Sequence, residues 1–285
     1  MINESKSIAV VYLAWLPYGI GYLEKFVESY NTYNAGAEHQ LLIVFNGKKQ
    51  SNDFNQFLYY AQAHLPKFEY LEMDEGQDID AYFFAAKNTI CEYILFLNTY
   101  SRFNAEGWLL KFIHSFTENK YGLIGATASK QSLYNTVFLT HKWIWEFKKG
   151  IRFNIKKYKQ FLKTAFYWSF IINKFPNPHI RTSAFMIPRD LFLTIKMQVL
   201  ERKFDAYLFE SGKKSLTNQV LDKGWEIGVI GKDGIVYKRN EWESSNVFWI
   251  NNQENLLISD NQTDLYINAT LEYKKYLTLI AWGIK

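Results

Sequence analysis

A turn of polar residues, Asn98 to Arg102, directly follows a short apolar segment at Tyr93–Leu97. In open α/β sheets, ligands bind at the carboxyl ends of the strands, which is where such a turn would lie. We therefore take this turn as a candidate ligand-binding site. The alternative interpretation is an ordinary strand-to-helix turn with polar caps.

The elements that would position this turn are strands and helices in alternation. Apolar, β-branched runs predict strands at Ser7–Leu13, Gln40–Phe45, Phe68–Met73, Tyr93–Leu97 and Gly122–Ala126. Helical spacing of apolar residues predicts helices between them, at Gly21–Tyr33, Phe54–Leu65, Asp78–Ile90 and Glu106–Phe116. Such alternation predicts a Rossmann-like α/β fold, a mainly parallel sheet flanked by helices. The chain has no Gly-x-Gly-x-x-Gly sequence after its first strand and no Gly-Lys-Ser/Thr loop, which argues against the usual dinucleotide and phosphate-loop sites.

The second half of the chain continues this pattern after an interruption at 130–178. Strands are expected at Thr182–Ile187 and Trp225–Ile230, and helices from Pro188 to about Met197, at Ser215–Asp222 and at Asp264–Leu279. We therefore predict one α/β domain over residues 1–235, with 130–178 as a helical insertion. Residues 236–285 would be a C-terminal extension packed on the same domain.

The interruption contains a basic and aromatic segment, 141–175. Its basic residues are Lys142, Lys148, Lys149, Arg152, Lys156, Lys157, Lys159, Lys163 and Lys174, and its single acid is Glu146. An amphipathic helix of this composition can pack on the sheet or form a dimer surface, or it can lie on an anionic membrane. A nucleic-acid patch is disfavoured because no recognition motif accompanies it.

Composition limits the compartment and the cofactors. The single cysteine, Cys91, allows no internal disulfide and fits a reducing compartment, and we expect it to be a buried, inert thiol. No signal peptide and no run long enough to span a membrane are evident, so a cytoplasmic location is expected, at the inner face of the membrane if 141–175 binds lipid. The five histidines do not pair at metal spacing, so zinc is not expected.

Taken together, the order and spacing of these segments over roughly residues 7–231 resemble the bacterial GT-A-fold glycosyltransferases, near the large inverting family 2 of sugar transferases. The matching pieces are Tyr12-Leu13-Ala14, the strand ending at Asn46, the stretch from Asp74 to Asn88, the strand ending at Asn98–Ser101, the strand Arg181–Met186, and the acidic segment Asp205–Glu210.

The resemblance implies transfer of a sugar from a nucleotide-sugar to a hydroxyl of a glycan or lipid-linked acceptor, in surface polysaccharide or lipopolysaccharide assembly. It assigns nucleotide and donor binding to Tyr12, Asn46, Asp74, Asp80, Lys87, Asn98, Tyr100, Ser101 and Arg102. It assigns the acceptor side to His179, Arg181, Thr182 and Ser183. A C-terminal lid containing Trp242, Phe248, Trp249 and the polar run Ser259–Thr263 is a further candidate, with Asp260 available to sugar hydroxyls.

The catalytic base implied by the resemblance is Glu210 or Asp205. An inverting transfer needs a carboxylate that takes the proton of the acceptor hydroxyl. We favour Glu210, because Ser211-Gly212 follow it and we expect it to lie at a helix N-terminus, where a carboxylate stays ionised. The alternatives are a helix-capping acid at Glu210 and a solvated loop acid at Asp205.

One departure from the family concerns metal binding. Family members end the fourth strand in Asp-x-Asp, which holds a divalent metal on the donor diphosphate, whereas this chain has Asn98-Thr99-Tyr100. Mg²⁺ and Mn²⁺ prefer charged oxygen ligands, so no metal ligand is assigned. Arg102 or Lys87 can neutralise the phosphate instead, or Asp74 or Asp80 can supply a ligand. Alternatively, the chain is a catalytically silent glycan-binding or assembly subunit.

Overall fold

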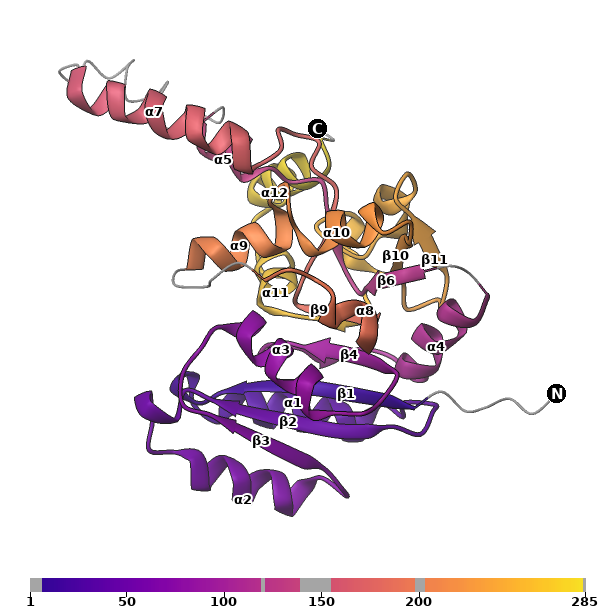
Figure 1. Cartoon of the computed structure of the whole chain (residues 1–285). Coiled ribbons are helices and arrows are strands. Elements are labelled where there is room, and N and C mark those ends of the chain that lie inside the picture. The colour runs from indigo at the N-terminus through magenta and orange to yellow at the C-terminus, as the bar shows by residue number, and fades with distance from the viewer. Residues whose placement is uncertain (1–6, 119–120, 139–154, 198–202, 284–285) are drawn as a thin grey trace.

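The computed structural model describes residues 7–118, 121–138, 155–197 and 203–283. Within them lies an eight-stranded sheet in the order β11-β10-β6-β9-β4-β1-β2-β3 (Figure 1). The strands are β1 (Ile8–Trp15), β2 (Gln40–Asn46), β3 (Glu69–Met73), β4 (Tyr93–Leu97), β6 (Tyr121–Gly125), β9 (Ala184–Pro188), β10 (Glu226–Ile230) and β11 (Val236–Lys238). The predicted α/β class, with a mainly parallel sheet flanked by helices, is confirmed.

The direction of β9 places two distant turns side by side. β1 pairs in parallel with β2 and β4, whereas β9 runs antiparallel between β4 and β6. Leu97 at the end of β4 is therefore opposite Ala184 at the start of β9. The turn that precedes β9 consequently meets the turn that follows β4, at the same edge of the sheet.

Helices cover both faces of the sheet because successive side chains of a strand point to opposite faces. In β1, Val11 and Leu13 belong to the core on the side of α3 (Asp78–Asn88), whereas Val10 and Tyr12 belong to the core on the side of α1 (Gly21–Thr32). The remaining helices of the first half are α2 (Phe54–His64) and α4 (Trp108–Glu118). Short 3-10 helices lie at Leu16–Tyr18 and Lys48–Gln50. The predicted buried position of Cys91 is confirmed.

The predicted insertion begins and ends at a two-stranded sheet. β7 (Ala128–Ser129) pairs antiparallel with β8 (His179–Ile180). Between them the structure describes α5 (Leu133–Phe138) and α7 (Ile155–Ile171), whereas the basic stretch at 139–154 falls outside the described residues. None of the helices described is both long and apolar enough to cross a membrane.

The rest of the second half is mainly helical, and one of its helices differs from the prediction. The helices are α8 (Arg189–Leu193), shorter than expected, α9 (Lys203–Ser211) and α10 (Leu216–Asp222). The single helix expected at Asp264–Leu279 is wrong. Two helices, α11 (Asn261–Ile267) and α12 (Leu271–Trp282), take its place because Thr270 caps α12 by accepting a hydrogen bond from the N–H of Tyr273.

The C-terminal residues join the main body through the core. β11 extends the large sheet beyond the predicted boundary at 235. β12 (Ile258–Ser259) pairs with β5 (Arg102–Phe103), next to the turn that follows β4. Trp242 and Phe248 are buried in the core, and the remaining 3-10 helices lie at Trp242–Ser245 and Asn251–Gln253. This packing contradicts the expectation that Trp242, Phe248 and Trp249 form a lid.

Candidate functional site

A cleft of about 440 Å³ opens at the edge of the sheet where β1 and β4 end. Its walls come from the loop after β1, the N-terminus of α3, the turn after β4, the turn before β9, α9 and the N-terminus of α11. Six of the residues predicted for the site line it: Asn98, Tyr100, Arg181, Thr182, Ser183 and Glu210. The site is therefore assembled from both halves of the chain.

The turn after β4 is held by the side chain of Asn98. Its Oδ1 accepts hydrogen bonds from the N–H of Tyr100 at 3.1 Å and from the hydroxyl of Ser101 at 3.0 Å. The N–H of Asn98 donates to the carbonyl of Ser183 at 2.8 Å, which ties this turn to the one before β9. Ser101 is fully buried and lies behind the turn. Asn98 and Ser101 thus shape the cleft wall.

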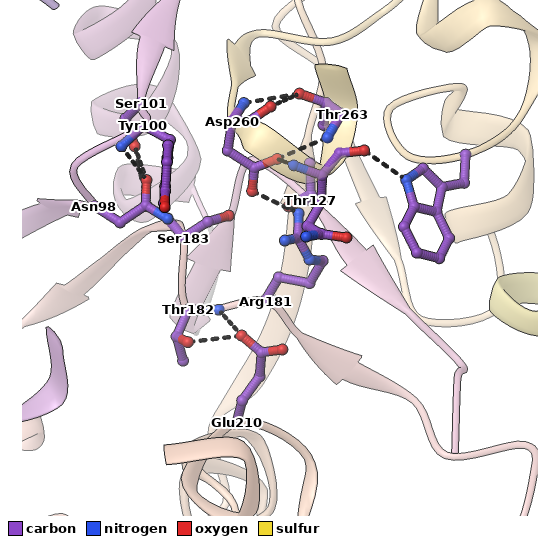
Figure 2. Close-up of polar contacts among 12 residues, drawn as sticks. Asn98, Tyr100, Ser101, Thr127, Arg181, Thr182, Ser183, Glu210, Asp260 and Thr263 are labelled. Atoms are coloured by element: carbon purple, nitrogen blue, oxygen red, sulfur yellow. Dashed lines mark hydrogen bonds and ion pairs between the residues drawn. The ribbon is translucent and has the colours of Figure 1, made fainter. Parts of the chain in front are cut away.

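Glu210 enters the cleft from the last turn of α9. Its Oε2 accepts hydrogen bonds from the N–H of Thr182 at 2.7 Å and from the hydroxyl of Thr182 at 2.6 Å (Figure 2). Ala206 and Glu210, one helical turn apart, both line the cleft, whereas Asp205 is not part of its lining. The expectation that Glu210 lies at a helix N-terminus is wrong, because Lys203–Ser211 is itself a helix and Glu210 is near its C-terminal end.

A buried ion pair lies beside Glu210. Nη1 of Arg181 is 2.7 Å from Oδ2 of Asp260 and donates to the hydroxyl of Thr127 at 3.3 Å (Figure 2). The guanidinium lies 4.4 Å from the centre of the Phe248 ring. Burial alone would raise the pKa of Asp260, but Arg181, the N–H of Thr263 and Ser183 outweigh it and lower the pKa. Asp260 is therefore an ionised structural partner of Arg181, and the expectation that it is free to bind sugar hydroxyls is wrong.

His179 lies behind the cleft rather than in it. The ring is buried, and Nδ1 lies 2.8 Å from the carbonyl oxygen of Asn177. Burial lowers the pKa of His179, whereas the nearby Glu210 acts in the opposite direction. The imidazole is therefore neutral near pH 7, and the structure does not place it at an acceptor surface.

Aromatic side chains form another wall. Trp15, the last residue of β1, and Tyr18, in the 3-10 helix that follows it, line the cleft together with Tyr100. The rings of Tyr18 and Tyr100 are 5.6 Å apart, and Tyr22 packs edge-on against Tyr100 at 4.8 Å. Burial and the hydrogen bond with Tyr18 raise the pKa of Tyr100, so its hydroxyl remains protonated. Ring faces of this kind can stack on a base or a sugar.

Tyr12 is not available to a nucleotide base. Its side chain is fully buried, its ring stacks on Phe26 with centroids 3.8 Å apart, and its hydroxyl donates to the carbonyl of Thr99 at 2.8 Å. The expectation of base stacking at Tyr12 is wrong because this strand position points into the core. Its hydroxyl instead supports the turn after β4 from beneath.

Three further residues expected to bind the nucleotide, two acids and an asparagine, have side chains outside the cleft lining. Asp74 is exposed outside the cleft lining. Oδ2 of Asp80 accepts the N–H of Gln77 at 2.8 Å as part of a capping box at the start of α3. Asn46 is buried at the end of β2 and donates to the carbonyl of Gly76 at 3.0 Å. Asn46 and Asp80 therefore support the cleft wall at residues 76–79 from behind, and none of the three side chains lines the cleft.

The two cations expected at the donor phosphates also lie elsewhere, which corrects both expectations. Nη2 of Arg102 lies 2.5 Å from Oδ1 of Asp264 and lines a separate cavity of about 330 Å³. Lys87 is exposed in the last turn of α3, whose first turn lines the cleft. At 1.5 Å per residue, the two ends of that helix are separated by more than 10 Å.

The cleft as a whole is acidic. Among the described lining residues, Arg181 is the single Lys or Arg, and Asp260 neutralises it. Asp78 and Glu210 add carboxylates to the same lining. In the part of the chain that the structure describes, no group of three or more His, Cys, Asp or Glu side chains is arranged to hold a metal. Oδ1 of Asn98 already accepts two hydrogen bonds, so the turn after β4 does not fit Mg²⁺ or Mn²⁺.

Sequence reasoning missed Trp15, Tyr18 and Asp78, which line the cleft, whereas Gln262 belongs to the polar run Ser259–Thr263 that was expected near the sugar. Trp15 and Tyr18 were recoverable, because they follow the first strand directly at its carboxyl end. Asp78 was visible only as an acid in the first turn of a helix. Within that run, Asn261 and Gln262 line the cleft at the N-terminus of α11, which directly follows β12.

Comparison with known proteins gives limited information. No family model matches this chain, and no curated protein is similar to it in sequence. Among solved structures, S. aureus TarS 1-349 in complex with UDP-GlcNAc is 14% identical, with 42% of this chain and 33% of that chain covered and a TM-score of 0.33. The mannosyltransferase PcManGT from Pyrobaculum calidifontis, in complex with GDP-Man and Mn²⁺, is 9% identical, with 65% and 45% covered and a TM-score of 0.41.

This chain therefore spans less than half the length of either of those chains. Both TM-scores are low, so the comparisons by themselves assign no activity. The class that is established is an α/β protein with a mainly parallel sheet and a polar cleft at the ends of its strands.

Proposed function

We propose that this protein is an inverting glycosyltransferase that moves a sugar from a nucleotide-sugar to a hydroxyl of a glycan or lipid-linked acceptor, in assembly of a surface polysaccharide. The observation that carries the proposal is the position of Glu210. Its carboxylate lines a polar cleft at the carboxyl ends of the strands, and two hydrogen bonds from Thr182 hold it there.

Glu210 is the proposed general base. As the acceptor oxygen attacks the anomeric carbon, the O–H proton passes to the carboxylate, and a new C–O bond forms. On the opposite face of the sugar, the bond between the anomeric carbon and the phosphate oxygen breaks. The nucleoside diphosphate leaves with that electron pair. Thr182 is a positioning residue, since its N–H and its hydroxyl both donate to that carboxylate.

The donor would enter beside the N-terminus of α3. Residues 77–79 line the cleft there, and helix N-termini favour anionic groups. Arg181 lies in the same lining, and a guanidinium has five N–H donors, of which the contacts to Asp260 and Thr127 use only those on Nη1. We assign these groups to the diphosphate, and the aromatic wall of Trp15, Tyr18 and Tyr100 to the base or the sugar.

A second candidate, a glycan-binding or assembly subunit without turnover, is favoured by the charge of the cleft. The one cation in the described lining is neutralised by Asp260, and the carboxylates of Asp78 and Glu210 disfavour a diphosphate. Aromatic rings and hydrogen-bonding groups without excess positive charge suit a neutral sugar. This candidate predicts glycan binding and no nucleotide binding.

Calorimetric titration separates the two candidates. The purified protein is titrated with UDP, GDP, CMP and dTDP, each with Mn²⁺ and with EDTA. Binding of one nucleotide supports the transferase and identifies the donor class, and the effect of EDTA reports whether a metal accompanies the donor. Absence of binding for all of them under both conditions contradicts the transferase and supports the glycan-binding candidate.

A further inference from the structure

The C-terminal part of α7 exposes a cluster of large apolar side chains. Leu162, Phe166, Tyr167 and Phe170 are 48%, 66%, 59% and 61% exposed. With 3.6 residues per turn, these positions fall within about 140° around the helix axis, with Lys163 among them. Phe166 and Phe170 contact each other edge-to-face at 4.8 Å. α7 extends away from the sheet, with α5 beside it (Figure 1), and these four side chains stay about half or more exposed.

The opposite side of α7 is anchored. Trp168 stacks on Phe204 of α9 with ring centroids 4.9 Å apart. The N–H of Lys213 donates to the carbonyl of Ile171 at 2.9 Å, and the buried Ile172 bridges to Gly212. The exposed cluster is therefore not the usual core-facing side of the helix, which these contacts already occupy.

The charged side chains that α7 itself contributes are all basic. Lys163 and Lys174 are exposed next to it, and the sequence of α7 has further lysines at 156, 157 and 159 and no Asp or Glu. A second copy of this chain would present the same positive charges, which repel. An anionic bilayer provides negative headgroups for the lysines and acyl chains for the apolar side chains.

We propose that α7 docks this protein on an anionic membrane surface through Leu162, Phe166, Tyr167 and Phe170, with Lys163 and Lys174 contacting the headgroups. We place the helix on the surface rather than across the bilayer, because its described part contains four lysines and no Asp or Glu. α9, on which Trp168 packs, also carries Ala206 and Glu210 of the cleft. Docking through α7 therefore keeps the cleft one helix away from the bilayer, where a lipid-linked acceptor would be found.

Vesicle co-sedimentation tests this surface without any nucleotide, so its outcome is independent of the proposed transferase activity. The full-length protein is mixed with vesicles of phosphatidylcholine alone and of phosphatidylcholine with an equal share of phosphatidylglycerol. The test variant is Phe166→Ser/Phe170→Ser. The matched control is Tyr59→Ser/Ile90→Ser, which removes two side chains that are 69% and 95% exposed, on α2 and in the loop before β4.

The wild type and the control should bind the anionic vesicles, at least tenfold more tightly than the neutral ones, and high salt should weaken binding. The test variant should lose about tenfold or more in affinity, the order expected for two phenyl rings that no longer enter the bilayer. Circular dichroism checks that both variants keep the helical content of the wild type.

Equal binding by the test variant and the wild type overturns the proposal, as does no binding to anionic vesicles. Sedimentation velocity without vesicles tests whether a second copy of this chain binds to the same side of α7. A dimer that the test variant abolishes would show that a second copy covers this face, and would also overturn the membrane assignment.

Discussion

Glu210 on α9 and Thr182 in the turn before β9 are joined by two hydrogen bonds to one carboxylate oxygen, at 2.7 Å from the backbone N–H and 2.6 Å from the hydroxyl. Hydrogen bonds to a charged carboxylate are stronger than those between neutral groups. This pair therefore fixes the direction in which Glu210 enters the cleft, whereas Asp205 is not part of the cleft lining.

Replacement of the proposed base should strongly reduce turnover. Glu210→Gln keeps the shape of the side chain but cannot accept a proton, so the rate of sugar transfer should fall by about 10²- to 10⁴-fold. Asp205→Asn is the matched control and should keep a rate close to that of the wild type, because Asp205 is not part of the cleft lining. Steady-state kinetics with the donor found by calorimetry measures both. A larger loss for Asp205→Asn would reverse the assignment.

Thr182 should affect turnover through Glu210. Thr182→Val removes the hydroxyl that contacts Oε2 but keeps the backbone N–H and the shape, and Thr182→Ser keeps the hydroxyl. A hydrogen bond to a charged group contributes about 1.5–3 kcal/mol, so kcat of the Val variant should fall by about tenfold or more, with KM for the donor unchanged. The Ser variant should be close to the wild type. If Ser and Val lower kcat equally, the hydroxyl does not position the base.

The ion pair between Arg181 and Asp260 should contribute mainly to stability. Both side chains are nearly inaccessible, at 10% and 3% exposed, so Asp260→Asn leaves a buried guanidinium without its counter-ion. Breaking a buried pair in this way should lower the free energy of unfolding by about 3–5 kcal/mol. Asp264→Asn, which breaks the more exposed pair with Arg102, should cost less than about 1 kcal/mol. Urea unfolding measures both, and equal losses would contradict this account.

His179 should make the protein less stable at mildly acidic pH. Burial lowers the pKa of His179 in the folded state, so between that pKa and the ordinary value near 6.5 the unfolded chain binds a proton that the folded chain does not. Above the unfolded-state pKa near 6.5, His179 is neutral in both states and costs the folded protein no stability. As pH falls below that value, the free energy of unfolding decreases by at most about 1.4 kcal/mol per pH unit. The lowered pKa of Asp260 has no effect in this window, because that group stays ionised in both states.

Urea unfolding midpoints at pH 7.5 and pH 5.5 test whether stability falls at mildly acidic pH, as predicted. The wild type should lose more stability between these values than His179→Gln. Part of the loss should remain in the variant, because burial also lowers the pKa of His39. A wild type that is more stable at pH 5.5, or the same pH dependence in both proteins, would show that His179 does not titrate in this way.

Much of the sheet was predictable because its signals are local. The predicted Gln40–Phe45 is β2 with one residue added, and the predicted Tyr93–Leu97 is β4 unchanged. Each depends on an apolar run between turn residues. The helix at Asp264–Leu279 was predicted wrongly because apolar spacing continues through its break, and only the capping contact of Thr270 shows where α12 begins.

The site was predictable only in part. Asn98, Tyr100 and Thr182 line the cleft because each lies at or next to the end of a predicted strand, whereas Glu210 was indicated only by the family resemblance. The roles expected for Tyr12, Lys87 and Arg102 were wrong because the direction of a side chain depends on tertiary packing. Tyr12 points into the core. Arg102 forms an ion pair with Asp264, in the segment that follows the pairing of β12 with β5.

The amino-acid sequence by itself determined the fold class, the strands that end at the cleft and the basic, aromatic character of the insertion. Each of these follows from the residue types within a short window. Only the tertiary structure decided that Glu210 rather than Asp205 lines the cleft, that Asp260 neutralises Arg181, and that the turns of Asn98 and Ser183 meet. These relationships join segments far apart in the chain, and they arise because β9 runs antiparallel beside β4 and α11 packs against the same edge.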